Sequence, residues 1–213
     1  MSVPDPLASI RASLMAKPVL IFLAGPNGSG KSTFYDEYLQ RLDLPYVNAD
    51  RIAAILRATD PTASLDEINQ RAFKEAETLR MALAEAGLSF CTETVFSDPV
   101  GAKLRFLEKA RARGFTVFLV FIGLDSVVLG VARVKHRAEH GGHDIPDEKL
   151  YARFPRTLAN LRAAIPLVDE VYVLDNSSYD TPYRVVAVYL AGRLVSQHPP
   201  LPRWTQGLPG LGD

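Results

Sequence analysis

Cysteine is almost absent from this chain of 213 residues, since Cys91 is the only one. A single thiol excludes a disulfide within the chain, and this fits a reducing cytoplasm, where we expect the protein to reside. No apolar run approaches the roughly 18 consecutive residues that a membrane-spanning helix needs. Residues 1–17 also lack the long apolar region of a secretory signal, so we expect an N-terminal arm over 1–16 with a short helix at 8–16.

An excess of charge of either sign is absent as well. Lysine plus arginine number 24, as do aspartate plus glutamate, so the formal net charge is +0. Without a bulk positive field, neither long nucleic acids nor anionic membranes are favoured as partners. No internal repeat is visible, and the length suits one domain spanning residues 1–213.

What the chain does contain is a complete phosphate-binding P-loop, G-x-x-x-x-G-K-[ST]. An apolar run at 18–24 precedes it and a helical pattern at 34–42 follows, which is the strand, loop and helix order that this motif requires. Glycines let the backbone wrap around phosphates so that its N–H groups point at the anion. The residues expected to bind a nucleoside triphosphate are Gly25, Pro26, Asn27, Gly28, Ser29, Gly30, Lys31, Ser32 and Thr33.

Two of these side chains have specific roles in the pattern. Lys31 is expected to reach the β- and γ-phosphates and to act in catalysis. Ser32, rather than Thr33, is expected to place its hydroxyl on Mg²⁺. The sequence therefore predicts ATP and Mg²⁺ as cofactors, although no motif that reads the base is legible.

Apolar runs and helical patterns alternate along the chain. We expect strands at 18–24, 44–50, 88–94, 115–122 and 170–175, and helices at 34–42, 51–57, 65–86, 99–113 and from about 126. This alternation predicts a three-layer α/β P-loop kinase fold with a mostly parallel central sheet and a C-terminal hairpin over 184–190 and 193–196. The tail at 198–213 is rich in proline and glycine, and we expect an extended surface segment without a fixed role.

Carboxylates follow the predicted strands at the edge where ligands bind to parallel sheets. Asp50 is suited to act as the base that accepts the proton of an acceptor hydroxyl, or to cap the helix at 51–57. Glu93, between the hydroxyls of Thr92 and Thr94, is either part of an acceptor site or an exposed strand end. Asp125 is an alternative to Asp50 as the partner of Mg²⁺, or a cap for the helix that begins near 126.

A basic segment follows the fourth predicted strand. Arg133 and Arg137 share one helix face, and Arg153 and Arg156 follow a possible hinge at 141–142. The pattern is typical of a lid that closes arginines onto phosphates, and it also fits a solvated basic helix. A zinc site is not favoured for His136, His140 and His143, because the glutamate is not placed as in H-E-x-x-H.

Taken together, these motifs resemble the zeta toxin family over about residues 17 to 178. The motifs are the P-loop, Val-Asn-Ala-Asp50, Thr-Glu93-Thr, Arg133-x-x-x-Arg137-x-x-x-Gly-Gly-His with Ile-Pro, Asn160-Leu, and Asp175-Asn176-Ser177. Members of this family use ATP and Mg²⁺ to phosphorylate the 3′-hydroxyl of the amino sugar in UDP-N-acetylglucosamine. The resemblance implies an ATP-dependent kinase acting on a hydroxyl of a UDP-activated sugar.

The resemblance also implies roles for individual residues. Asp50 becomes the general base, Glu93 and Thr94 part of the sugar-nucleotide pocket together with Asp50, and Lys31 and Ser32 the phosphate and metal ligands. Arg133, Arg137, Arg153 and Arg156 become candidate clamps for the γ-phosphate. Such toxins are commonly held by a small antitoxin protein, which makes an antitoxin a possible partner.

Two other functions are compatible with the same residues. A P-loop kinase could phosphorylate a nucleoside, a nucleotide cofactor or a nucleic-acid 5′ end. A nucleotide-dependent switch would instead hydrolyse its nucleotide slowly and act through conformation. Asp50 discriminates between them, because a switch has little use for a base that faces an acceptor.

Overall fold

The computed structural model describes residues 6–139 and 145–212. Within these residues, seven strands form one sheet in the order β2-β3-β1-β4-β5-β6-β7. The strands are β1 (Val19–Ala24), β2 (Tyr46–Val47), β3 (Phe90–Thr94), β4 (Thr116–Gly123), β5 (Glu170–Asp175), β6 (Arg184–Leu190) and β7 (Arg193–Gln197). The first five in spatial order are parallel, and β6 and β7 join antiparallel to β5 as the predicted hairpin.

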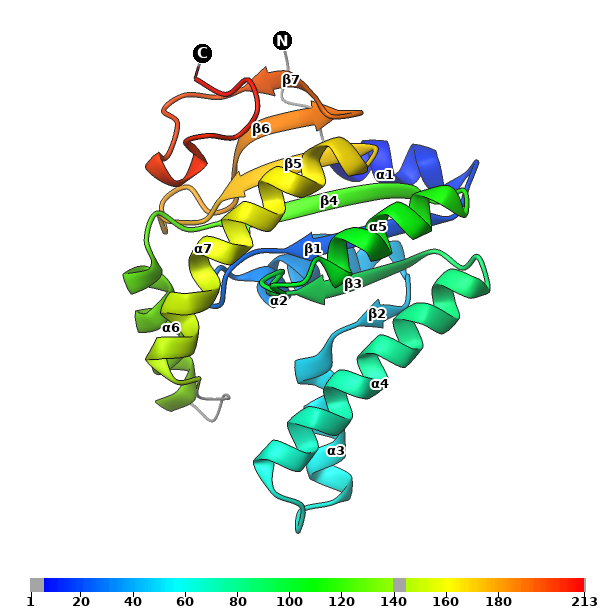
Figure 1. Ribbon diagram of the computed structural model, residues 1–213, viewed down its shortest axis with the longest axis vertical. Coiled ribbons are helices and arrows are strands. Elements are labelled where there is room, and N and C mark those ends of the chain that lie inside the picture. The colour runs from blue at the N-terminus through cyan, green and yellow to red at the C-terminus, as the bar shows by residue number, and fades with distance from the viewer. Residues whose placement is uncertain (1–5, 140–144, 213) are drawn as a thin grey trace.

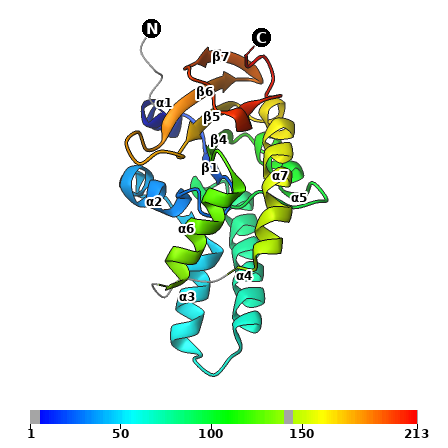
Figure 2. The ribbon, with the colours of Figure 1, turned by 90° about the vertical axis from the view of Figure 1, so that its left-hand side faces the viewer.

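Helices cover both faces of this sheet (Figures 1 and 2). They are α1 (Pro6–Leu14), α2 (Lys31–Phe34), α3 (Ala49–Thr59), α4 (Leu65–Glu85), α5 (Ala102–Ala112), α6 (Val127–Glu139) and α7 (Asp147–Ala164). Figure 2 shows α1 and α2 on one side of the sheet and α5 and α7 on the other. β1 is buried along its whole length because its side chains enter a core on each face. The predicted three-layer α/β P-loop kinase fold is confirmed.

Helices α3 and α4 form a hairpin that extends beyond the sheet (Figure 1). Ser64 and Glu67 make a reciprocal capping box at the start of α4, as the spacing of serine and glutamate before an apolar pattern favours. A small core of Ala53, Ile68 and Ala72 joins the two helices. The hairpin matters for the site because the first turn of α3 carries Asp50.

The second strand is shorter than expected, which changes the setting of Asp50. β2 ends at Val47, because the Asn48 side chain starts helix α3 there. Asn48 Oδ1 accepts hydrogen bonds from the backbone N–H groups of Asp50 (2.8 Å) and Arg51 (3.1 Å). Asp50 therefore lies in the first helical turn rather than at a strand end, and Asn48 is the N-cap that the sequence suggested Asp50 might be.

The P-loop helix also departs from the expected span of 34–42. Its α-helical part covers only Lys31–Phe34, and a π-helical turn (Tyr35–Leu39) and a 3₁₀ turn (Gln40–Leu42) continue it. Tyr35 stacks on Tyr46 of β2 with ring centroids 3.5 Å apart. The apolar periodicity predicted a helix, but it could not predict this local change in winding.

The prediction for the C-terminal tail was wrong. Trp204, Leu208 and Leu211 are buried in the core that α7 also covers. The Trp204 indole lies over Gly123, where an added Cβ would stand 2.3 Å from the ring, and its Nε1 donates to Asp175 Oδ1 at 3.1 Å. A segment rich in proline and glycine can still bury large side chains when a few apolar residues are placed between the turns. The tail closes the core beside β4.

Among the described residues, none of the helices combines the length and the apolar character required to cross a bilayer.

Candidate active site

The P-loop connects β1 to α2 at the carboxyl edge of the sheet. Gly25, Gly28 and Gly30 have φ angles of 150°, 76° and 88°, which L side chains rarely adopt. A Cβ on Gly28 would lie 2.5 Å from the Gly130 carbonyl oxygen, so α6 packs directly against the loop. The loop borders a cavity of about 550 Å³ that is also lined by Arg133, Arg137 and the segment after β5.

Side chains from outside the P-loop hold three of its successive carbonyl groups. Arg133 donates weakly to Gly28 O (3.5 Å), Asn176 Nδ2 donates to Ser29 O (2.9 Å), and the Tyr183 hydroxyl donates to Gly30 O (3.0 Å). With these carbonyl groups fixed, the loop keeps the conformation in which its N–H groups can cradle an anion. Asn176 is thus a support of the P-loop, a role that the sequence did not reveal.

Lys31 is buried at the start of α2, with 6% exposure, and its Nζ donates to Pro26 O at 2.9 Å. Burial lowers the pKa of Lys31, while the carboxylates of Glu93 and Asp50 act in the opposite direction. Among the described residues, this buried ammonium group donates to a neutral carbonyl oxygen, so it is suited to bind the charged phosphates of a nucleotide.

Glu93 lies at the end of β3, in register with Leu23 on the neighbouring strand β1, and so beside the P-loop. Its carboxylate accepts hydrogen bonds from Ser32 Oγ (3.0 and 3.2 Å to its two oxygens), from Asn48 Nδ2 (2.8 Å) and from the Tyr46 hydroxyl. Burial and the nearby Glu93 raise the pKa of Tyr46, so its hydroxyl remains a donor.

The pair formed by Ser32 and Glu93 has the chemistry of a magnesium site. Mg²⁺ prefers hard oxygen ligands and is typically bound by one or two carboxylates together with substrate phosphates. A serine hydroxyl and a carboxylate in direct contact, next to a phosphate-binding loop, fit that requirement. From the sequence, Glu93 was expected in an acceptor site or at an exposed strand end, because the pairing of β3 with β1 is not visible in the order of residues.

Asn48 is a site residue that the sequence analysis did not single out. It is 4% exposed, and its amide group connects two carboxylate residues. Nδ2 donates to Glu93 while Oδ1 holds the first turn of α3, which carries Asp50. The signal in the sequence was that an asparagine lies two residues before Asp50, since asparagine is a common N-cap residue at the start of a helix.

A second cavity, of about 420 Å³, adjoins the first at Glu93, which lines both. It is lined by Asp50, Thr94 and Phe73, by the cationic residues Arg80, Lys103, Arg153 and Arg156, and by the turn at 95–99. Thr94 Oγ1 accepts from the N–H group of Phe96 at 3.2 Å and so holds this turn. A nucleotide in the first cavity and an acceptor in the second would meet beside Glu93 and Asp50.

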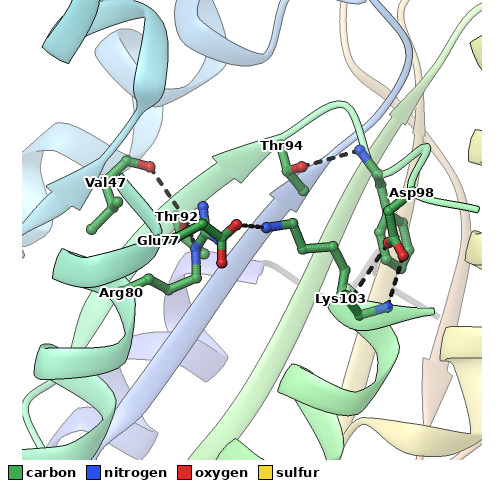
Figure 3. Close-up of polar contacts among 9 residues, drawn as sticks. Val47, Glu77, Arg80, Thr92, Thr94, Asp98 and Lys103 are labelled. Carbon is green, nitrogen blue, oxygen red and sulfur yellow. Dashed lines mark hydrogen bonds and ion pairs between the residues drawn. The ribbon is translucent and has the colours of Figure 1, made fainter. Parts of the chain in front are cut away.

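Arg80 and Lys103, which line the second cavity, form a polar cluster with Glu77 (Figure 3). Glu77 pairs with Arg80 Nη1 at 2.6 Å and with Lys103 Nζ. Arg80 Nε also donates to Thr92 Oγ1 (3.0 Å), and this hydroxyl donates to the Val47 carbonyl (3.3 Å). One carboxylate therefore balances two cations, and Arg80 connects α4 to strands β2 and β3.

The four arginines of the basic segment are divided between the two cavities. Arg133 and Arg137 line the P-loop cavity, whereas Arg153 and Arg156 line the cavity that contains Asp50. Burial and the adjacent Arg156 lower the pKa of Arg153, and Asp50 acts in the opposite direction. All four arginines were candidate clamps for the γ-phosphate, and each pair of them lines a different cavity. The hinge at 141–142, with His140 and His143, lies outside the described residues.

Asp125 does not line either cavity. Its backbone N–H donates to Ser177 Oγ at 2.8 Å, and Ser126 Oγ, rather than Asp125, accepts from Leu129 N (3.3 Å) in the first turn of α6. Neither the metal role nor the capping role considered for Asp125 therefore matches its position.

The fold and the P-loop define a P-loop kinase-like α/β protein. Residues 20–155 match the AAA domain family AAA_33, and the chain belongs to that family. An uncharacterized protein of Haemophilus influenzae is 29% identical over 135 residues, which cover 63% of this chain and 91% of that protein.

Solved structures agree with this fold. Crystal structures of the AvrRxo1-ORF1:AvrRxo1-ORF2 complex, one with sulphate ions and one with ATP, contain a chain that is 18% identical with a TM-score of 0.70. The match covers 90% of this chain but only 64% of the length of that one. A structure from the PezAT chromosomal toxin-antitoxin system of Streptococcus pneumoniae is 15% identical, with a TM-score of 0.56, over 88% of this chain and 82% of that one.

Proposed function

We propose that this protein is an ATP-dependent kinase of the zeta toxin type, which transfers the γ-phosphoryl group of ATP to a hydroxyl of a UDP-activated sugar. The observation that carries the proposal is that the P-loop cavity and the cavity containing Asp50 meet at Glu93. A hydrolytic switch needs only the first of these cavities. A kinase needs both, because its acceptor must approach the γ-phosphate in line with the leaving group.

On the donor side, the P-loop N–H groups and Lys31 bind the β- and γ-phosphates, and Arg137 reaches the γ-phosphate from α6. Ser32 and Glu93 would hold Mg²⁺. When bound, the ion neutralises charge that develops between the β- and γ-phosphates during transfer. Asn48 and Tyr46 orient the Glu93 carboxylate for this task.

On the acceptor side, Asp50 accepts the proton of the attacking hydroxyl as its oxygen bonds to the γ-phosphorus. The bond between that phosphorus and the bridging oxygen breaks, and ADP leaves with the electron pair. Arg153 lies close enough to interact electrostatically with Asp50 and lines both the acceptor cavity and a small cleft beside Pro26 and Asn27. In this proposal Arg153 stabilises the phosphoryl group in transit.

A sugar nucleotide suits the acceptor cavity for two reasons. Arg156 Nε is buried there without a hydrogen-bond partner among the described residues, and an anionic phosphate group would provide one. Phe73, which is 59% exposed on α4, offers an aromatic face to a planar ring. The resemblance to zeta toxins points to UDP-N-acetylglucosamine as the first acceptor to test.

The test is incubation of the purified protein with ATP, Mg²⁺ and a panel of UDP-sugars, nucleosides and a DNA oligomer, followed by phosphorus NMR and mass spectrometry. Phosphate on a UDP-sugar hydroxyl is the expected result. Asp50→Asn should reduce transfer by about 10²- to 10⁴-fold and leave ATP affinity nearly unchanged. Phosphorylation of another acceptor would replace the sugar assignment, and hydrolysis of ATP without any acceptor would favour a switch.

A protein partner is part of the proposal. The structural neighbours include a toxin-antitoxin system and the two-component AvrRxo1 complex. An antitoxin that covers the P-loop cavity would inhibit this chain by excluding the nucleotide. A neighbouring gene product that binds the protein and is displaced by excess ATP would support this, whereas binding that ATP does not affect would contradict it.

A further inference from the structure

The outer wall of the P-loop cavity is formed by the segment between β5 and β6. Ser178, Tyr179, Pro182 and Tyr183 all line the cavity there. Tyr179 is 82% exposed, and the guanidinium carbon of Arg133 lies 5.2 Å from the centroid of its ring. An aromatic ring and a planar cation thus stand together at the rim of the site where we propose that ATP binds.

Hydrogen bonds and ring contacts hold the part of this segment that lies next to the P-loop. Asn176 Nδ2 donates to Ser29 O, and Asn176 Oδ1 accepts a long hydrogen bond from Tyr183 N at 3.4 Å. The ring of Tyr183 packs edge-on against Phe34 and Tyr38, with centroids 5.1 and 5.8 Å away. The segment is therefore anchored next to the P-loop and presents Tyr179 at its outer end.

Arg133 and Arg137 have different interaction partners in the cavity. Arg133 Nη1 donates to Asn176 O at 2.8 Å and so bridges α6 and the segment after β5, on the Tyr179 side of the cavity. Arg137, one helical turn further along α6, interacts electrostatically with Lys31, the phosphate-binding lysine. We therefore expect the two arginines to interact with different parts of a bound nucleotide.

We propose that Tyr179 and Arg133 form the base subsite of the nucleotide, where the purine ring stacks on the tyrosine. This inference rests on the proposed use of a nucleoside triphosphate. Every base has a π-face, so stacking tolerates different bases, whereas discrimination requires hydrogen bonds to the edge of the ring. Among the described residues that line this cavity, Asn176 carries the one amide side chain, and both its Nδ2 and its Oδ1 are already hydrogen-bonded. ATP and GTP are therefore bound with affinities within about tenfold of each other.

The experiment measures dissociation constants for ATP, GTP and inorganic triphosphate, each with Mg²⁺, by calorimetry. Tyr179→Ala should weaken binding of ATP and GTP about tenfold and leave inorganic triphosphate unchanged, because only the nucleotides have a base to stack. Tyr179→Trp should preserve the affinity for both nucleotides. Tyr151→Ala is a matched control, since Tyr151 is also an exposed tyrosine (49%) and lines neither cavity.

The possible failures are distinguishable. If Tyr179→Ala weakened inorganic triphosphate as much as ATP, the residue would act on the phosphate site and the base subsite would be wrong. An ATP to GTP preference above about 100-fold would show that hydrogen bonds read the base edge, and would also overturn the inference. If the unaltered protein bound none of the three probes, the proposed nucleotide function would fail as well.

Discussion

Replacement of Asn48 by aspartate separates the two functions of its side chain. An aspartate can still accept the hydrogen bonds from Asp50 N and Arg51 N, and aspartate and asparagine are about equally good N-caps. It cannot donate to Glu93, whose carboxylate lies 2.8 Å from Nδ2. Asn48→Asp therefore keeps the cap of α3 and places two carboxylates against each other.

The size of the effect follows from this contact. Two unit charges about 4 Å apart repel by about 4 kcal/mol at an effective dielectric constant of about 20. The pair relieves this repulsion by sharing a proton, so one of the two carboxyl groups of the variant stays protonated to a higher pH than an isolated carboxyl group. Lys31, whose charge interacts with Glu93, reduces this effect somewhat.

The sign of the pH dependence is determined by proton binding. Between about pH 4 and pH 7 the folded variant binds a proton that the unfolded chain has released, so its stability falls as the pH rises. The free energy of unfolding of Asn48→Asp should lie below that of the unaltered protein by less than about 1 kcal/mol near pH 4.5. The difference should approach about 4 kcal/mol above about pH 7.5. Phosphoryl transfer should fall over the same range, because the Glu93 carboxylate would no longer be oriented beside Ser32.

The assay is urea unfolding at several pH values, monitored by the fluorescence of Trp204, the one tryptophan of the chain. Asn48→Ala is the matched control. This variant loses the helix cap and the donor to Glu93 without adding a charge. Its loss of unfolding free energy, about 1 kcal/mol for the cap together with the lost hydrogen bond, should therefore not depend on pH. An equal penalty for Asn48→Asp at pH 5 and pH 8 would refute the bridging role of Asn48.

Three further predictions test the supports of the site. Tyr183→Phe removes the donor to Gly30 O and should weaken ATP binding about fivefold, for a hydrogen bond worth about 1 kcal/mol; calorimetry that finds no change would contradict its role in holding the P-loop. Trp204→Ala should destabilise the fold by about 3–5 kcal/mol, measured by thermal unfolding, and should leave ATP affinity below the melting temperature unchanged; a loss below 1 kcal/mol would show that the tail is not part of the core. Because burial lowers the pKa of Lys31, the affinity for ATP should begin to fall at a pH below the 10.5 of an ordinary lysine. Lys31→Arg should abolish this pH dependence, because an arginine stays charged over the whole range. An identical pH profile of ATP affinity for the two proteins would argue against a charged Lys31 as the phosphate ligand.

Local patterns in the sequence were sufficient for the fold and the nucleotide loop. The spacing of glycine, lysine and serine specified the P-loop, and the continuous apolar runs specified the central strands. Each of these features depends on neighbouring residues, whose backbone conformations and hydrogen bonds are formed within a few positions of one another. The same locality explains why the class of fold could be predicted without a structure.

The assembly of the site depended on tertiary structure instead. The pairing of β3 with β1 brings Glu93 to Ser32, 61 positions away, and a buried amide then connects Glu93 to the helix of Asp50. Likewise, the packing of α6 and α7 divides the arginines between two cavities, although one basic segment carries them all. Contacts between distant positions follow from strand order and helix packing, which residue spacing alone does not specify. The sequence by itself determined which chemical groups are present, and only the tertiary structure decided which of them meet.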